Sequence, residues 1–70
     1  MTLRVVPLPA QSGLKFDLIF ESYHVVTLHI SEAELAQNGG LSPRSQIEKK
    51  VLDYLGDNGY NIDSLYLYFY

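Results

Sequence analysis

The sequence LYLYFY occupies residues 65–70, and apolar residues alternate with tyrosines along its whole length. Successive side chains of a β-strand point to opposite faces, so this alternation predicts a strand with two different faces. One face would carry Leu65, Leu67 and Phe69, and the other Tyr66, Tyr68 and Tyr70. The second set is half of the six tyrosines of the chain. We expect this strand to begin near Ile62.

Two further apolar runs predict a β-hairpin in the first half of the chain. In residues 14–20, one face carries Leu14, Phe16, Leu18 and Phe20, and the other carries Lys15, Asp17 and Ile19. In residues 24–30, one face carries Val26, Leu28 and Ile30, and the other carries Val25, Thr27 and His29. Only Glu21-Ser22-Tyr23 separates the two runs, which favours a tight antiparallel connection. A shorter strand is expected at Thr2–Val6, stopped by Pro7 and Pro9, because proline lacks the N–H group that a strand ladder uses.

Helix signals fill the region between residues 31 and 59. Ser31-Glu32-Ala33-Glu34 matches a capping box, and Asn38-Gly39-Gly40 ends that short helix. Ser42-Pro43 predicts a second helix start, and Gly56-Asp57-Asn58-Gly59 its end. The apolar stripe of the second helix consists of Ile47, Val51, Leu52, Tyr54 and Leu55, with Glu48, Lys49, Lys50 and Asp53 facing water.

The order of elements is therefore β-β-β-α-α-β, in one small α+β domain that spans residues 1–70. We expect a two-layer fold with a four-stranded, mostly antiparallel sheet, one helical layer, and one open face that carries aromatic rings. A right-handed crossover through the helices would place the last strand parallel to the first or to the third, and we favour pairing with the first.

Side-chain parity divides the strands between a covered face and an open face. The covered face is expected to hold Leu14, Phe16, Leu18, Phe20, Val26, Leu28, Ile30, Leu65, Leu67 and Phe69. The open face is expected to hold Lys15, Asp17, Ile19, Val25, Thr27, His29, Tyr66, Tyr68 and Tyr70.

Composition limits the functions that this chain can support. Five basic and eight acidic residues give a net charge of −3, which disfavours generic binding to a phosphate backbone. The chain has no cysteine, so disulfides and thiolate metal sites are excluded. It has no apolar run near the ~20 residues that span a bilayer, and no signal-peptide pattern, so we expect a cytoplasmic protein without membrane contact.

No catalytic or cofactor motif accompanies the strands and helices. His24 and His29 are five residues apart, so on one strand they point to opposite faces and cannot bind the same metal ion. Asp17 and His29 share a face, where a polar contact is a simpler explanation than a charge relay. No serine has an identifiable base, and the glycines form no phosphate-binding pattern. We expect a non-enzymatic protein without metal or cofactor.

Two explanations of the tyrosine row stand side by side. Tyrosine favours β-strands, and cross-strand aromatic contacts contribute about 0.2–1 kcal/mol each, so the rings can serve stability alone. Tyrosine is also enriched at protein interfaces, and the thin core of a 70-residue chain favours association. If the row is an interface, the chain is a small regulatory, inhibitor-like or adaptor-like module. Its partner would be another protein or a second copy of itself in a homodimer. The interface residues would be Tyr66, Tyr68, Tyr70, His29, Thr27 and Lys15.

Single-stranded nucleic acid is the alternative partner of the same face. Exposed aromatic rings on a four-stranded sheet can stack bases, at about 1–3 kcal/mol for each base. Only Lys15 accompanies the rings on the predicted face, however, and the net charge is negative. Nucleic acid is therefore the less favoured partner.

Overall fold

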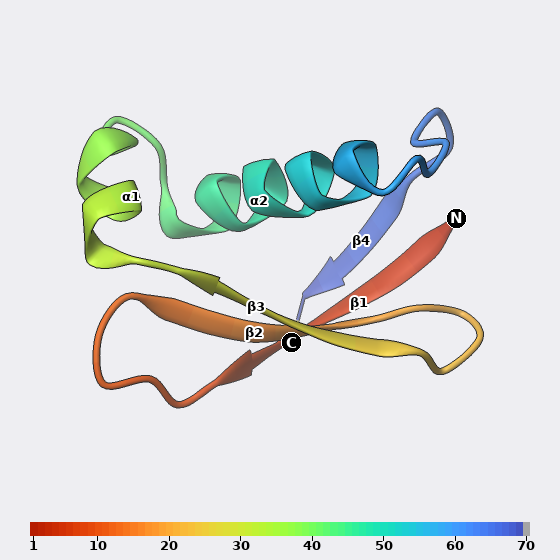
Figure 1. The fold of residues 1–70 in the computed structure, drawn as a ribbon, viewed down its shortest axis with the longest axis horizontal. Helices are drawn as coiled ribbons and strands as arrows, with labels where there is room; N and C mark the ends of the chain where they lie inside the picture. The colour runs from red at the N-terminus through yellow and green to blue at the C-terminus, as the bar shows by residue number, and fades with distance from the viewer. Residues whose placement is uncertain (70) are drawn as a thin grey trace.

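The computed structural model describes residues 1–69 and has the predicted order of elements. Its elements are β1 (Thr2–Leu8), β2 (Leu14–Ile19), β3 (Val25–Ile30), α1 (Glu32–Gln37), α2 (Pro43–Asp57) and β4 (Tyr66–Phe69). Figure 1 shows both helices on the same side of the sheet. The prediction of an α+β fold with one helical layer is confirmed.

The four strands form a mixed sheet in the order β3-β2-β1-β4. β1 pairs antiparallel with β2, and β2 pairs antiparallel with β3. β4 pairs parallel with β1, with Thr2 opposite Tyr66 and Val5 opposite Phe69. The predicted parallel pairing of the first and last strands is therefore correct. It leaves β3 and β4 as the two edges of the sheet.

β1 is longer than the sequence predicts, because Pro7 lies within the strand, opposite Phe16 of β2. The backbone N–H of Tyr66 donates to the carbonyl of Met1, so the odd-numbered residues of β1 direct their backbone groups toward β4. Pro7 is odd-numbered, so its nitrogen points away from β2, and the hydrogen bonds between β1 and β2 do not need it. The prediction that this proline stops the strand was wrong.

The turn between β2 and β3 is the expected tight connection. The N–H of Tyr23 donates to the carbonyl of Phe20, and the N–H of Phe20 donates to the carbonyl of His24, both at 2.9 Å. Tyr23 has a φ of 63°, the left-handed conformation that closes three-residue hairpin loops. Glycine or asparagine usually occupies this position, so the tyrosine is a strained residue.

Serine caps begin both helices. The Oγ of Ser31 accepts from the N–H of Glu34, and the Oγ of Ser42 accepts from the N–H of Ser45, each at 3.1 Å. The carboxylate of Glu34 interacts in turn with the backbone and the hydroxyl of Ser31, so the predicted capping box forms, and the same carboxylate also accepts from Lys50. The second helix begins at Pro43 as predicted.

The core lies between α2 and the covered face of the sheet. Its buried residues come from β1, β2, the strand ends and α2: Leu3, Val5, Phe16, Leu18, Phe20, Ile30, Val51 and Leu55. The central strand β1 contributes two of them, which the parity analysis of the other strands omitted. Edge residues such as Val26 and Leu67 are only half-buried, because an edge strand has a neighbour on one side alone.

The last strand begins at Tyr66 rather than near Ile62. The side-chain oxygen of Asn61 accepts from the N–H of Asp63 at 3.0 Å, which holds this segment in a turn. The ammonium group of Met1 donates to the carbonyl of Ser64 at 2.7 Å. The two contacts set the point at which the chain enters the sheet beside β1.

Candidate functional site

The open face of the sheet, opposite the helices, is built from cross-strand rows. Tyr68, Arg4, Ile19 and Val25 form one row across all four strands. The next row is Val6, Asp17 and Thr27, and the third is Leu8, Lys15 and His29. The parity assignment of the open face is therefore correct for its described residues.

The tyrosine pair, Tyr66 and Tyr68, lies at the β4 edge of this face. Tyr66 is 65% exposed and Tyr68 is 59% exposed, so most of each ring is open to solvent. Tyr66 lies opposite Thr2, and Tyr68 lies opposite Arg4. Tyr70, the third member of the predicted row, lies outside the described residues. The described part of the row is a pair of rings with a guanidinium group on the neighbouring strand.

The other predicted interface residues lie at the opposite side of the sheet. Lys15 is on β2, and Thr27 and His29 are on the edge strand β3. All three are exposed. Because β1 and β2 separate β3 from β4, the two edges are about 14 Å apart at the usual strand spacing. The structure thus places the predicted interface on one face but does not bring it together into one cluster.

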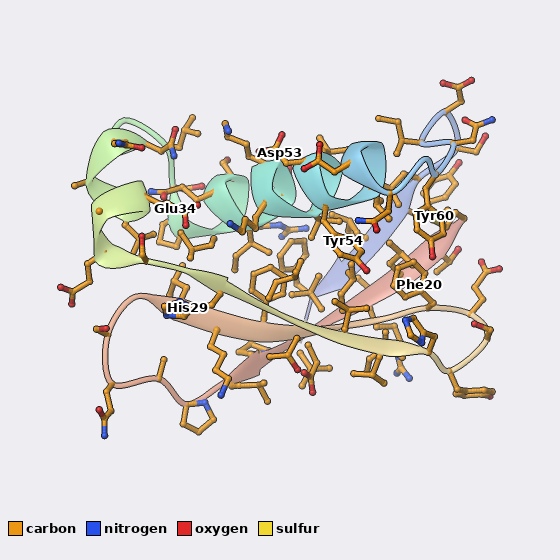
Figure 2. The ribbon with its side chains drawn as sticks, in the orientation of Figure 1. Phe20, His29, Glu34, Asp53, Tyr54 and Tyr60 are labelled. Carbon is orange, nitrogen blue, oxygen red and sulfur yellow. The ribbon has the colours of Figure 1, made fainter. Side chains whose placement is uncertain are left out.

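The expected contact between Asp17 and His29 does not form. Asp17 lies opposite Thr27 and accepts a 2.6 Å hydrogen bond from its hydroxyl. His29 lies opposite Lys15, and its Nε2 is 3.1 Å from the carbonyl oxygen of Ser12. Figure 2 shows His29 at the same end of the molecule as Glu34 and far from Phe20 and Tyr60. The register of the β2–β3 hairpin determines which residues lie opposite Asp17 and His29, and side-chain parity alone does not predict that register.

Sequence reasoning missed two exposed residues, Arg4 and Tyr23, that line the same hollow. Arg4 was not assigned to a face, although its alternation with the buried Leu3 and Val5 carries that signal. Tyr23 was treated only as part of a turn, yet it is 86% exposed in a strained conformation. Both line a shallow hollow at the Thr2 end of the open face. The aromatic end of the face is therefore larger than the last strand alone.

Within residues 1–69, no strand pairs with the outer edge of β4. Tyr66 uses its N–H toward β1, and backbone direction alternates along a strand. The backbone groups of Leu65, Leu67 and Phe69 therefore point away from β1, to the side where the sheet ends. Such an edge is a ready template for another strand.

A groove runs beside this edge, between β4 and α2. Its volume is about 400 Å³, and its apolar lining includes Leu52, Ile62, Leu65, Leu67 and Phe69. We refer to it as the β4 groove. Leu52 was predicted to face the core, but it is 41% exposed because α2 leaves the outer part of β4 uncovered.

The ion pair of Arg44 with Glu48 and the ring of Phe69 form the rim of the β4 groove. The guanidinium carbon of Arg44 lies 4.4 Å from the centre of the Phe69 ring, a cation–π geometry. The Nε of Arg44 is also 3.5 Å from a carboxylate oxygen of Glu48, one turn further along α2. The rim charges therefore neutralise each other.

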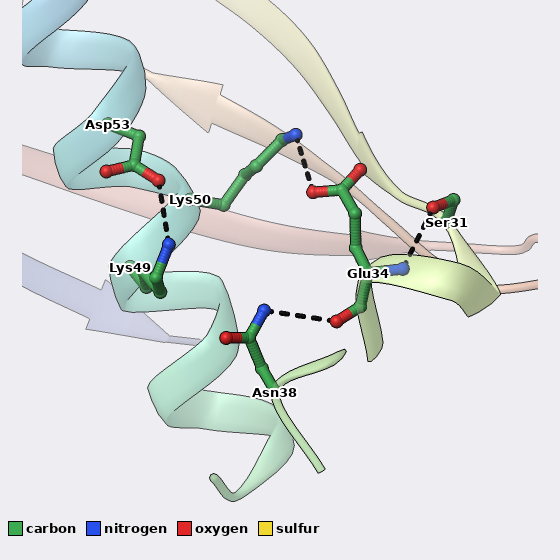
Figure 3. A network of polar contacts seen from close by, with 6 residues as sticks. All are labelled: Ser31, Glu34, Asn38, Lys49, Lys50 and Asp53. Carbon is green, nitrogen blue, oxygen red and sulfur yellow. Dashed lines mark hydrogen bonds and ion pairs between the residues drawn. The ribbon is translucent and has the colours of Figure 1, made fainter. Parts of the chain in front are cut away.

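A separate polar network joins the two helices (Figure 3). The Nζ of Lys50 donates to the carboxylate of Glu34 at 3.1 Å, and the side chain of Asn38 donates to the Glu34 carbonyl at 3.0 Å. The hydrogen bond from Lys50 is the main cause that holds the pKa of Glu34 below its ordinary value. The hydrogen bond between Lys50 and Glu34 holds α1 against α2.

Residues 1–69, which the structure describes, contain neither a cluster of metal ligands nor a helix that could span a membrane. No group of three histidine or acidic side chains within them is placed to hold a metal ion. None of the helices that they form is long and apolar enough to cross a membrane.

Comparison of the chain with protein-family models, with curated proteins and with solved structures found no match. The functional interpretation therefore depends on the geometry of the open face and of the β4 edge.

Proposed function

We propose that this protein is a small, non-enzymatic binding or assembly module that recognises a protein surface through the β4 side of its sheet. The observation that carries the proposal is the pair of largely exposed rings of Tyr66 and Tyr68 on an edge strand. A tyrosine offers a large apolar ring and a hydroxyl group, and it loses little side-chain entropy on binding.

The neighbours of the tyrosine pair support a contact surface. Arg4 lies opposite Tyr68, and arginine and tyrosine are both enriched at interaction hot spots. Tyr23 extends the aromatic end of the open face from the hairpin turn. Lys15, Thr27 and His29 lie across the sheet, so we assign them to the periphery of this surface rather than to its centre.

The test compares the native protein with the double variant Tyr66→Thr, Tyr68→Thr. Threonine keeps a high strand propensity, so the fold is retained while both rings are removed. We expect the double variant to lose association, measured by light scattering for self-association and by affinity capture for another protein. The matched control is Lys15→Thr with Thr27→Ser, which changes the far side of the same face. Equal association of the native protein and both variants would overturn the proposal.

Single-stranded nucleic acid is the second candidate partner, favoured by the position of Arg4 beside Tyr68. A cation next to an exposed ring is a common arrangement for base stacking. The net charge of −3 works against it. A fluorescence titration with short oligonucleotides at low salt distinguishes the two: salt-dependent binding that requires Tyr68 would support the nucleic-acid candidate, and its absence would eliminate that candidate.

A further inference from the structure

We infer that the partner of the β4 edge is a second copy of this chain, which adds its own β4 antiparallel and extends the sheet across a two-fold axis at Leu67. This inference rests on the proposed function, because it names the occupant of the same side of the molecule. It depends on three observations: the direction of the free backbone groups, the symmetry of the strand sequence, and the charge around the edge.

The free backbone groups belong to Leu65, Leu67 and Phe69, as described above. In an antiparallel pair, two residues that face each other through such groups exchange both of their hydrogen bonds. Centring the pair on Leu67 places Leu67 opposite its own copy, and Leu65 opposite Phe69 of the second copy. Every free backbone group from residue 65 to residue 69 then has a partner.

The same register matches the side chains, because the segment LYLYF reads nearly the same in both directions. Leu67 meets Leu67, and Leu65 meets Phe69, on the side of the β4 groove. Tyr66 of each copy meets Tyr68 of the other on the open face. Cross-strand aromatic pairs of this kind stabilise a sheet by about 0.2–1 kcal/mol each. A register centred on Tyr66 or on Tyr68 pairs fewer residues of this segment.

Charge places no obstacle in the way of this pairing. Residues 64–69 contain no ionisable side chain other than tyrosine, so a two-fold axis brings no like charges together there. The nearest rim charges, Arg44 and Glu48, are already paired with each other. The edge therefore lacks the charges and the proline that natural edge strands use against association.

The other edge of the sheet is less suited to self-pairing. The carbonyl of His24 accepts from Phe20, so the even-numbered residues of β3 direct their backbone groups toward β2. The odd-numbered residues Val25, Thr27 and His29 face outward. An antiparallel pair centred on Thr27 would bring Val25 against His29, an apolar side chain against a polar one. This edge provides a matched control.

The first experiment removes the central outward N–H group. We expect Leu67→Pro to weaken self-association at least tenfold relative to Leu67→Ala, measured by sedimentation equilibrium. Both variants lose the leucine side chain, but only proline removes the N–H, and proline is tolerated where the N–H of an edge strand faces solvent. Thr27→Pro on β3 should leave self-association unchanged. Equal association of Leu67→Pro and Leu67→Ala would overturn the inference.

The second experiment determines the register between the two copies of β4 by disulfide cross-linking of single-cysteine variants, which is possible because the native chain has no cysteine. Paired residues in an antiparallel ladder have Cα atoms about 5.5 Å apart, within the range that a disulfide bridges. Leu67→Cys alone should therefore form a covalent dimer on oxidation. Tyr66→Cys and Tyr68→Cys should each form no covalent dimer alone, because the two copies of either site are about 8 Å apart by strand geometry. A mixture of the two variants should cross-link.

The outcomes separate this inference from the proposed function. A native protein that stays monomeric at millimolar concentration overturns self-pairing. If such a monomer still captures another protein in a Tyr66- and Tyr68-dependent way, the proposed function survives. Covalent dimers formed by Tyr66→Cys or Tyr68→Cys alone, without Leu67→Cys, would overturn the Leu67 register.

Discussion

A Cβ atom on Gly13 would overlap the carbonyl oxygen of Ile30, at the point where the connection from β1 enters β2. Gly13 also has a φ of 70°, which side chains other than glycine rarely adopt. Gly13→Ala is therefore expected to destabilise the protein by about 2 kcal/mol or more, from backbone strain and the overlap together. Urea denaturation measures the loss. Gly40→Ala, where a Cβ meets open space, should change the free energy of unfolding by much less.

At Tyr23, in contrast to Gly13, replacing the residue with glycine should stabilise the protein. Its left-handed backbone costs a tyrosine about 1–2 kcal/mol, and its exposed ring has little packing to compensate. Tyr23→Gly should therefore raise the free energy of unfolding by about 1 kcal/mol, and Tyr23→Phe should leave it nearly unchanged. Thermal unfolding provides the measurement. A glycine variant less stable than the native protein would show that the ring makes stabilising contacts.

The pair of Glu34 and Lys50 predicts a pH dependence. The hydrogen bond from Lys50 lowers the pKa of Glu34 below its ordinary value of 4.5 in the folded chain. A carboxyl group with a lowered pKa stabilises the fold above its ordinary pKa, and this contribution is lost as the pH falls through the lowered pKa. The native protein and Glu34→Gln should therefore differ in stability at pH 7 and converge below pH 4.5.

Denaturation at a series of pH values tests this convergence. Asp53→Asn, which removes the carboxylate partner of Lys49 on the outer face of α2, controls for a general loss of surface charge. A difference between the native protein and Glu34→Gln that stays constant from pH 7 to pH 3 would contradict the prediction.

The tyrosine pair can be tested for a role in stability alone. Because both rings are largely exposed, Tyr66→Thr and Tyr68→Thr should each change the unfolding free energy of the monomer by less than about 1 kcal/mol. The measurement is urea denaturation at a concentration where self-association is absent. A loss of several kcal/mol at either position would instead support a purely structural role for the rings.

Local signals in the sequence predicted most of the fold. Alternation located the hairpin strands, and serine caps located both helix starts. The crossover rule limited β4 to pairing with the first or the third strand, and the structure pairs it with β1. Pro7 shows the limit of local rules, because whether a proline interrupts a strand depends on which neighbouring strand its nitrogen faces. Leu52 shows the same limit, because helical spacing cannot reveal that α2 leaves part of β4 uncovered.

The sequence predicted which face of the sheet carries the candidate site residues, but not how far apart they lie on that face. Parity placed Tyr66, Tyr68, Lys15, Thr27 and His29 on one face, and the structure agrees. Their separation into two sides follows from strand order, which is a tertiary property. The pairing of Asp17 with Thr27 instead of His29 follows from hairpin register, which changes every partner when it shifts by one residue.

The parallel pairing of β1 with β4 also has a consequence for folding kinetics. The Met1 ammonium and the Ser64 carbonyl meet across 63 positions of the chain, so this contact closes nearly the whole sequence into a loop. Forming a contact between distant residues costs loop-closure entropy, so such contacts form late in folding. The β2–β3 hairpin and α2, in contrast, form from local contacts. We expect β4 to join the sheet after the folding transition state, so that Leu67→Ala accelerates unfolding while the rate of folding stays nearly the same.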